Sequence, residues 1–144
     1  MKYRYSLTRI WDEDADHVLF ICCNPSTADA RNDDPTLIKC VHYAKRWGYG
    51  GVSMANLFAY RATKPKDMLS SKDPIGVDND KWLRKLFKGA GLVVAAWGNY
   101  GKHMARSEKI RQEFSNLYYL KLNASGEPSH PLYLKSTLKP KLLK

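Results

Sequence analysis

The chain has 144 residues, of which 44% are apolar and 26% charged, as in an ordinary globular protein. This length gives one domain with a core of its own and is too short for two. The net charge is +10. No apolar run approaches the roughly 20 residues that span a bilayer, and the polar start MKYRYSLTR does not resemble a signal peptide. We therefore expect a soluble, cytoplasmic protein that does not bind membranes.

The first predicted elements are an edge strand and a buried strand. YRYSLTRIW, residues 3–11, alternates polar and apolar side chains and predicts an edge strand or hairpin arm. After the acidic turn DEDAD, six apolar residues from Val18 to Cys23 predict a strand buried on both faces, as in a parallel sheet. This strand stops at the loop NPSTAD, residues 24–29. Because ligands of open α/β sheets bind outside the carboxyl ends of the strands, we expect the chemistry at this loop.

Three helix–strand pairs follow. Asp33 or Asp34 can cap a helix that begins at Pro35, and this helix precedes the strand VSMANLF. A helix over residues 76–89 precedes the strand GLVVAAWG, and a helix over residues 101–115 precedes the strand LYYLKL. This alternation predicts an α/β fold, a three-layer αβα sandwich with a mostly parallel four-stranded central sheet.

Charge is unevenly distributed along the chain. Up to Asp34 there are four basic and seven acidic residues, whereas from Pro35 onward there are twenty basic and seven acidic residues. This gradient favours a polyanionic partner, DNA or another nucleic acid, and a solubilising charge excess is the alternative. Residues 135–144 carry four lysines and no acid, which predicts a flexible basic tail, either a frayed terminus or an arm that contacts phosphates.

The cysteines give no sign of a cofactor. Cys22 and Cys23 lie in a strand pattern and Cys40 in a helix pattern, and no CxxC motif is present. We expect buried, reduced thiols rather than a disulfide framework or a metal site, and we expect no metal or other cofactor.

Each predicted strand ends in a polar loop, and parallel strands would bring these loops together in one pocket. The loops are NPSTAD, the segment from Asn56 to Arg61, WGNYGKH and SHPLYL. Each also has a local explanation: a plain turn at residues 24–26, a strand-end cap at Asn56 and an exposed loop histidine at His130. A hydrolase triad of Ser26, Asp29 and His130 is disfavoured because the loop lacks the GxSxG elbow.

Four segments together resemble a known family. NPSTAD, NLFAYRATKP, VVAAWG and HPLYL resemble domain-of-unknown-function family 1643 of bacteria and phages, over nearly the whole chain. More distantly, their order resembles the uracil-DNA glycosylase superfamily, with its proline-containing catalytic loop after the first strand, an asparagine ending the second, and a late His-Pro motif. This resemblance implies a uracil-DNA-glycosylase-like pocket that hydrolyses the N-glycosidic bond of a modified or mismatched base. The alternatives are a non-catalytic DNA or nucleotide binder and an enzyme acting on a small nucleotide.

The resemblance assigns roles to particular positions. Asn24 falls where the superfamily places a water-orienting acid or asparagine, and Asn56 falls where it reads the edge of the base. His130 would stabilise negative charge on the departing base, Arg61 would contact a phosphate, and Leu132 or Leu134 would wedge into the duplex. The continuation Pro131-Leu132 departs from the Pro-Ser of that superfamily, so the resemblance does not imply uracil specificity.

Cleavage of an N-glycosidic bond needs hydrogen-bond donors aimed at the base and a positioned water. Because Asn24 is an amide and cannot act as a base, a proton acceptor must come from Asp29, Asp33 or Asp34. A base in a duplex must also be flipped out and stacked, for which Trp97, Tyr100 or Tyr60 offers a ring. The expected catalytic residues are therefore Asn24, Asp29 and His130. The expected substrate contacts are Pro25, Ser26, Asn56, Arg61, Trp97, Tyr100 and Leu132.

Overall fold

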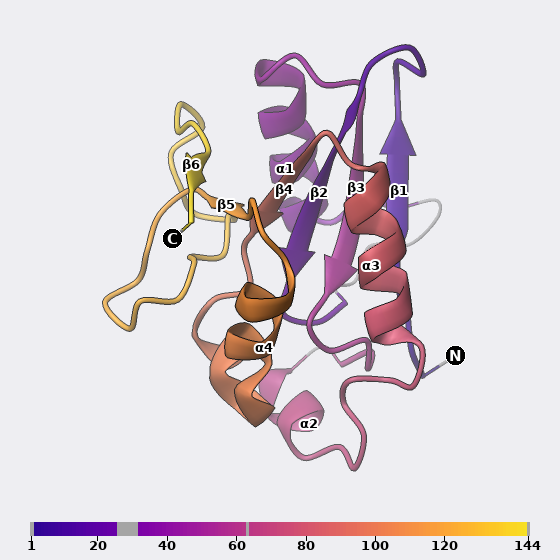
Figure 1. Cartoon of the computed structure of the whole chain (residues 1–144), viewed down its shortest axis with the longest axis vertical. Helices are drawn as coiled ribbons and strands as arrows, with labels where there is room; N and C mark the ends of the chain where they lie inside the picture. The colour runs from indigo at the N-terminus through magenta and orange to yellow at the C-terminus, as the bar shows by residue number, and fades with distance from the viewer. Residues whose placement is uncertain (1, 26–31, 63, 144) are drawn as a thin grey trace.

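The computed structural model describes residues 2–25, 32–62 and 64–143. In this part of the chain, six strands form one sheet in the order β1-β3-β2-β4-β5-β6, shown in Figure 1. The strands are β1 (Leu7–Ile10), β2 (His17–Cys22), β3 (Gly51–Asn56), β4 (Leu92–Ala95), β5 (Tyr118–Tyr119) and β6 (Lys141–Leu142). The helices are α1 (Pro35–Arg46), α2 (Pro65–Leu69), α3 (Asn79–Gly89) and α4 (Arg106–Glu113), with a 3₁₀ segment at Asn99–Ala105.

The predicted α/β class is confirmed, but the predicted sheet of four strands is too small. The four inner strands, β3, β2, β4 and β5, run parallel to one another as expected. The sheet gains an antiparallel strand at each edge, because β1 pairs with β3 and β6 pairs with β5. The edge strand expected near the amino terminus is β1, whereas β6 comes from the lysine-rich segment expected to be a tail.

The order of the strands creates a switch point between β2 and β4. The chain runs from β2 to β3 on one side, then crosses back to β4 on the other side of β2. The residue Val18 accordingly faces Val52 of β3 on one side and Leu92 of β4 on the other. Where the strand order reverses in this way, the loops at the carboxyl ends of the two strands diverge and leave a crevice.

The two faces of the sheet are covered by different helices (Figure 1). Because side chains alternate along a strand, Phe20 lies on the face that packs against α1, and Leu19 lies on the opposite face. On that second face Leu83 of α3 and Ile110 of α4 complete the core. With apolar side chains on both faces, β2 is buried from Val18 onward, as its uninterrupted apolar run predicted.

Local sequence explains where α1 begins but not where α4 begins. Asp34 caps α1 as predicted, since its side chain accepts a hydrogen bond from the Leu37 amide at 2.8 Å and Pro35 takes the first helical position. The helix predicted over residues 101–115 is instead split. Met104 and Ala105 have φ of 53° and 54°, a left-handed conformation that interrupts the helix, so α4 starts at Arg106.

The carboxyl-terminal segment packs back onto the fold. The Tyr43 hydroxyl donates to the Lys135 carbonyl at 2.6 Å, and the Trp47 Nε1 donates to the Leu138 carbonyl at 3.2 Å. Leu143 then donates its amide to the Leu117 carbonyl at 2.7 Å, just beyond β6. Within the described ranges, no helix has the length and apolar character required to cross a bilayer.

Candidate functional site

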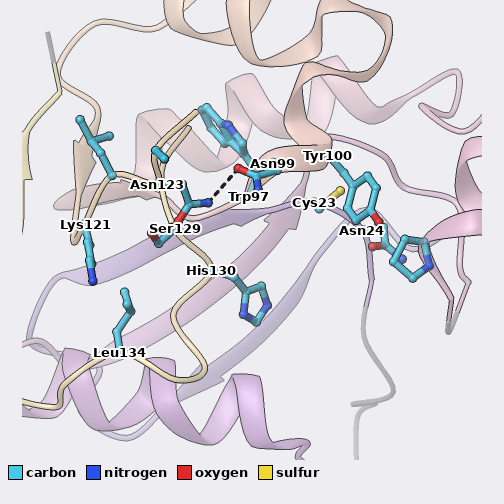
Figure 2. Close-up of a pocket in the computed structure, with 14 residues that line it drawn as sticks. Cys23, Asn24, Trp97, Asn99, Tyr100, Lys121, Asn123, Ser129, His130 and Leu134 are labelled. Carbon is cyan, nitrogen blue, oxygen red and sulfur yellow. Dashed lines mark hydrogen bonds between the residues drawn. The ribbon is translucent and has the colours of Figure 1, made fainter. Parts of the chain in front are cut away.

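A cavity of about 710 Å³ lies at the switch point, at the carboxyl ends of β2 and β4. Its walls come from the end of β2, from the loop after β4, and from the late loop that follows β5 (Figure 2). The lining residues are Cys23, Asn24, Pro65, residues 97–100, residues 121–124, Ser129, His130 and Leu134. The structure therefore brings together three of the four polar loops that the sequence placed at one sheet edge.

Asn24 lines the cavity, and its side-chain oxygen has no bonding partner among the described residues. Its Nδ2 donates to the Ala62 carbonyl at 2.9 Å and lies 3.4 Å from the Pro25 carbonyl. These bonds fix the orientation of the amide, and no described residue donates to its Oδ1. The side chain therefore offers a hydrogen-bond acceptor at the cavity wall, which is what a water-orienting role requires.

Asn56 lies behind the cavity wall and is not among the described lining residues. It is 4% exposed, and in the amide orientation that satisfies its surroundings Nδ2 donates to the carbonyls of Ala55 (3.2 Å) and Asn24 (3.1 Å). The side chain thus ties the end of β3 to the loop after β2. Asn56 therefore makes the contacts of a strand-end cap, the local alternative given for it above, and it also holds the backbone of Asn24 in place.

His130 presents a donor to the same cavity. Its Nδ1 accepts the Leu132 amide at 3.3 Å, which places the proton of the neutral ring on Nε2. His130 is an exposed residue, but partial loss of hydration of its ring lowers its pKa, and the opposing influence of Asp34 is smaller. The imidazole is therefore neutral at physiological pH, with an Nε2–H group available as a donor.

The loop that carries His130 is held against the loop after β4. The Gly98 amide donates to the Pro128 carbonyl at 2.8 Å. Gly98 has φ of 72°, a backbone conformation that favours glycine, whereas a Cβ at this position would make only an ordinary contact of 4.0 Å with the His130 Cβ. The glycine is therefore favoured by the turn of the backbone after β4 and not by the approach of the two loops.

Two aromatic residues predicted as stacking partners line the cavity with different exposures. Trp97 is 1% exposed, and Gly101 lies so close to its indole that a Cβ there would be 2.2 Å from the Trp97 Cδ1. Tyr100 is 49% exposed. Trp97 therefore acts as a rigid wall, and Tyr100 offers the accessible ring.

A buried carboxylate that the sequence analysis missed supports this wall. Glu127 is 6% exposed, and its Oε1 accepts from Trp97 Nε1 at 2.8 Å and from Ser107 Oγ at 2.5 Å. The bonds join the late loop, the end of β4 and the start of α4. The only signal in the sequence is an acid between Gly126 and Pro128 in a basic region.

A network of amide and hydroxyl groups forms another wall, also missed from sequence (Figure 2). Asn99 Oδ1 accepts from Asn123 Nδ2 at 3.0 Å and from Ser125 Oγ at 2.6 Å. Ser129 Oγ in turn donates to Asn123 Oδ1. The oxygen of Asn99 is occupied by these two donors, so its Nδ2 is the group left to meet a ligand.

The other predicted site residues lie elsewhere. Pro25 is buried next to Asn24, and Leu132 is half-buried, but neither is a described lining residue, whereas Leu134 is. Arg61 is exposed in a neighbouring hollow of about 500 Å³. Ser26 and Asp29 lie outside the described residues.

Asp33 and Asp34, the other two candidate proton acceptors, already accept hydrogen bonds within the fold. Asp33 accepts from Arg9 Nε at 3.0 Å and Nη2 at 2.7 Å, and Asp34 caps α1. The three cysteines are free and buried, as predicted. Burial raises the pKa of Cys23, which lines the cavity, to about 12, so this thiol is not a nucleophile at neutral pH.

Comparison with protein families identifies the chain. The model of the family described as "Protein of unknown function (DUF1643)" matches residues 4–132. The chain belongs to this family. No curated protein and no solved structure matches it. The family recognised from the sequence motifs is confirmed, and the more distant resemblance to glycosylases stays a prediction.

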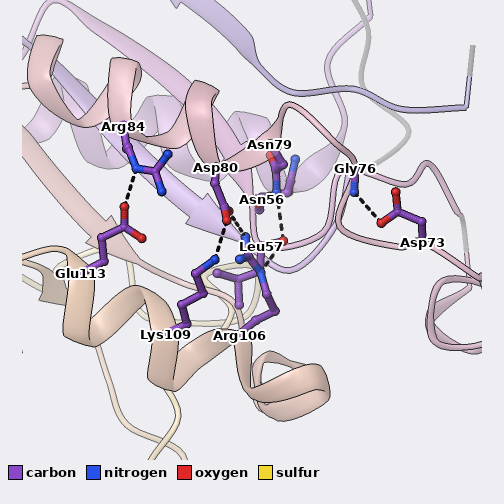
Figure 3. A network of polar contacts seen from close by, with 10 residues as sticks. All are labelled: Asn56, Leu57, Asp73, Gly76, Asn79, Asp80, Arg84, Arg106, Lys109 and Glu113. Carbon is purple, nitrogen blue, oxygen red and sulfur yellow. Dashed lines mark hydrogen bonds and ion pairs between the residues drawn. The ribbon is translucent and has the colours of Figure 1, made fainter.

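A second polar cluster fixes the end of β3 next to the cavity (Figure 3). Arg106 is 1% exposed; its Nε donates to the Leu57 carbonyl at 3.0 Å and its Nη2 to Asp80 Oδ1 at 2.7 Å. Lys109 Nζ donates to Asp80 Oδ2 at 2.7 Å. Asn79 Nδ2 donates to the carbonyls of Asn56 (2.8 Å) and Leu57 (3.0 Å). These bonds join α3, α4 and the strand end that carries Asn56.

Proposed function

We propose that this DUF1643-family protein holds one base of a nucleic acid in the cavity and hydrolyses the N-glycosidic bond of that base. The observation that carries the proposal is the pairing of Asn24 Oδ1, an acceptor, and His130 Nε2, a donor, on the walls of one cavity at the switch point. A uracil-DNA-glycosylase-like relationship is part of the proposal, supported by the central order β3-β2-β4-β5 and by the positions of these two residues.

The chemistry assigns each group to one part of the reaction. A water held by Asn24 Oδ1 adds its oxygen to the anomeric carbon of the sugar, and the bond from that carbon to the base nitrogen breaks. The electron pair leaves with the base, and the proton lost by the water ends on the base. The neutral His130 donates a hydrogen bond to the negative charge as it develops, which lowers the barrier. Tyr100 stacks on the base.

The charge distribution supports a polymer rather than a free nucleotide as the substrate. Twenty of the 24 basic residues follow Pro35, and Lys121 is exposed at the cavity rim. Lysine and arginine side chains neutralise phosphates and release counterions, so binding of a nucleic acid should weaken steeply with salt.

A non-catalytic reader of bases is the second candidate. The observation that favours it is the absence of aspartate or glutamate among the 14 described residues that line the cavity. Without a carboxylate the pocket would still bind a base through Asn24, His130 and Tyr100, but the water would lack a strong proton acceptor.

The test incubates the protein with duplex and single-stranded oligonucleotides that carry uracil, mismatches or modified pyrimidines. Abasic sites are scored by alkaline cleavage, and binding is measured by fluorescence anisotropy over a range of salt concentrations. We expect His130→Ala to lower the cleavage rate by about 10²–10³-fold, as for loss of one donor to developing negative charge, and Asn24→Ala also to lower it. The control is His42→Ala, an exposed histidine on α1 away from the cavity.

The outcomes separate the candidates. Cleavage that His130→Ala slows to the expected extent and His42→Ala preserves supports the glycosylase. Salt-sensitive binding without cleavage of any substrate supports the reader. Neither binding nor cleavage of any oligonucleotide would overturn both and leave an enzyme acting on a small nucleotide.

A further inference from the structure

An aromatic and basic segment lies at the same sheet edge as the cavity. The residues before β1 continue its antiparallel pairing past the end of β3, because Arg4 donates its amide to the Ala59 carbonyl at 2.9 Å and Arg61 donates its amide to the Lys2 carbonyl at 2.8 Å. Figure 1 shows this segment beside the first turn of α3, at the end toward which β3 points. The sequence Lys-Tyr-Arg-Tyr of residues 2–5 is thus brought to the carboxyl edge.

This segment forms a hollow of its own. A cavity of about 460 Å³ is lined by Lys2, Tyr3, Arg4, Tyr5, Ser6 and Trp82. The rings of Tyr3 and Tyr5 are parallel to within 8°, with centroids 6.4 Å apart. Three aromatic side chains around one open hollow offer flat apolar faces to a planar ligand.

The tyrosines are held in place by their neighbours. The Tyr3 hydroxyl donates to the Asp73 carbonyl at 2.7 Å, and the Tyr3 ring meets the Tyr60 ring edge-on, with centroids 5.8 Å apart. Gly76 packs so closely that a Cβ there would lie 3.1 Å from both Tyr3 and Tyr5. The rings are therefore fixed before any ligand arrives, which reduces the entropy lost on binding.

The surroundings of the hollow are mainly basic. Lys2 is exposed, Arg4 also lines the hollow, and Lys85 Nζ lies 5.0 Å from the centre of the Trp82 ring. Two acids lie close by: Asp73 accepts the Gly76 amide at 3.1 Å through Oδ1, and the exposed Asp78 accepts the Trp82 amide at 3.1 Å through its backbone carbonyl. An aromatic surface bordered by cations suits a nucleotide, because the base can stack on the aromatic side chains while its phosphate pairs with a lysine or arginine.

The hollow and the switch-point cavity are separate, and residues 60–62 link them. Tyr60, whose ring contacts Tyr3, lines the intermediate hollow together with Arg61 and Ala62. The Ala62 carbonyl is also the acceptor that fixes Asn24 in the first cavity. Along the sheet edge, the order is therefore the aromatic hollow, then Arg61, then the pocket for the base.

We propose that the hollow lined by Tyr3, Tyr5 and Trp82 is a second subsite that stacks a base flanking the one held in the cavity. Arg61 contacts the phosphate that crosses between the two. This subsite rests on the proposed function, since it assigns the path of the same nucleic-acid strand. It recognises the flat face of a base and not its edge, so it favours a single-stranded or locally opened strand without reading its sequence.

The first experiment changes the ligand and leaves the protein intact. Pentanucleotides with the preferred base in the centre are compared with versions in which one flanking nucleotide, on the 5′ or the 3′ side, is abasic. The phosphates are unchanged, so the electrostatic attraction is preserved. We expect one of the two flanking substitutions to weaken binding by about five- to a hundredfold, as for loss of one stacked base, and the other to weaken it far less.

The second experiment uses two tryptophans in matched settings. Trp82→Leu removes a ring of the subsite. Trp11→Leu removes a ring that likewise has a lysine over its face, since Lys45 Nζ lies 5.1 Å from the centre of the Trp11 ring. Trp11 follows the end of β1 and lies next to Gly50, which precedes β3, so it is at the amino ends of the parallel strands and not at their carboxyl ends. We expect Trp82→Leu to weaken binding of the intact pentanucleotide and to remove the effect of the abasic flank, while Trp11→Leu changes neither. Circular dichroism checks that each variant folds, and Tyr5→Leu replaces Trp82→Leu if that variant does not.

The failures of the two proposals can be distinguished. If the wild-type protein binds no oligonucleotide at low salt, the proposed function fails and the subsite fails with it. If it binds but tolerates abasic residues on both flanks equally, or if Trp82→Leu and Trp11→Leu behave alike, the subsite is wrong and the base pocket stands.

Discussion

The two polar clusters at the carboxyl edge of the sheet differ in what their groups contact. In the cluster around Arg106, the donors and acceptors are bonded mostly to one another (Figure 3), and within the described chain only Asn79 Oδ1 and Arg106 Nη1 are buried without a partner. In the cavity at the switch point, Asn24 and His130 line the wall (Figure 2), and no described residue bonds to Asn24 Oδ1 or His130 Nε2. The first arrangement serves stability, because unbonded buried groups are costly. The second keeps polar groups ready for a ligand.

This difference gives a rule for separating structural from functional residues in this protein. A side chain that closes a network, such as Asn56, Asp80 or Glu127, should mainly change the free energy of unfolding when it is replaced. A side chain that leaves one atom unbonded at the cavity, such as Asn24 or His130, should mainly change binding or catalysis. Substitutions in each group test the rule.

The largest effect on stability is expected from Asp80→Ala. This substitution leaves the guanidinium of Arg106, 1% exposed, without its carboxylate, and removal of one partner of a buried pair costs about 3–5 kcal/mol. Burial alone would raise the pKa of Asp80, but the hydrogen bonds from Arg106 and Lys109 outweigh it and the pKa is lowered. The carboxylate therefore stabilises the fold above its ordinary pKa of 3.8, and this contribution is lost as the pH falls through the lowered value.

Urea unfolding at neutral and acidic pH measures this effect. The control is Glu113→Ala, which removes the exposed pair between Arg84 Nε and Glu113 Oε1 at 2.5 Å, and for which we expect a loss of about 0–1 kcal/mol. The curves of the wild type and Asp80→Ala should converge at low pH. Equal losses for the two variants at neutral pH would show that the Arg106 cluster is not a special source of stability.

A smaller loss of stability is expected when Glu127 is replaced. Glu127→Gln keeps an acceptor for Trp97 and Ser107 but removes the charge, which weakens two charge-assisted bonds by about 1 kcal/mol in total. Glu127→Ala leaves both donors unsatisfied and should cost about 3 kcal/mol. If Glu127 holds the Trp97 wall, both variants also reduce the near-ultraviolet circular dichroism of the tryptophans.

The matched control lies on the neighbouring helix. Glu108 is an exposed acid on α4, and Glu108→Ala should change the unfolding free energy by less than about 0.5 kcal/mol. A wild-type near-ultraviolet spectrum in Glu127→Ala would contradict the role of Glu127 in positioning Trp97, whatever the loss of stability.

The sequence predicted the parts of the fold that depend on local patterns. The apolar run of β2 indicated a strand buried on both faces, and Asp34-Pro35 marked the start of α1 because a cap and a fixed φ act within one turn. The interruption before α4 was not predicted, since Met104 and Ala105 are not residues that usually adopt a positive φ.

Long-range contacts explain the rest of the misses. The strand β6 is only two residues long and exists because it pairs with β5, more than twenty residues earlier. Glu127 is buried because its partners Trp97 and Ser107 lie 30 and 20 residues away. For the site, the loops at Asn24, Trp97 and His130 were placed together correctly. The sequence did not show that Asn24 lines the cavity whereas Asn56 is buried behind its wall. Which side chains of a loop reach the cavity depends on how the loops pack against one another.

The smallest expected effect concerns the protonation of His130. The ring of the exposed His130 is partly desolvated, so its pKa lies below the ordinary value of 6.5, and its Nδ1 accepts the Leu132 amide. As the pH falls from 6.5, the unfolded chain takes up the proton before the folded protein does, so this histidine contributes a small loss of stability between 6.5 and its lowered pKa.

Nuclear magnetic resonance can follow the imidazole and the Leu132 amide together. We expect one midpoint below 6.5 for both signals, because a protonated Nδ1 can no longer accept the amide. Base binding that depends on the neutral ring would be lost over the same range. A midpoint at or above 6.5 would mean that the His130 ring is fully hydrated and that the donor at Nε2 is not held ready for a ligand.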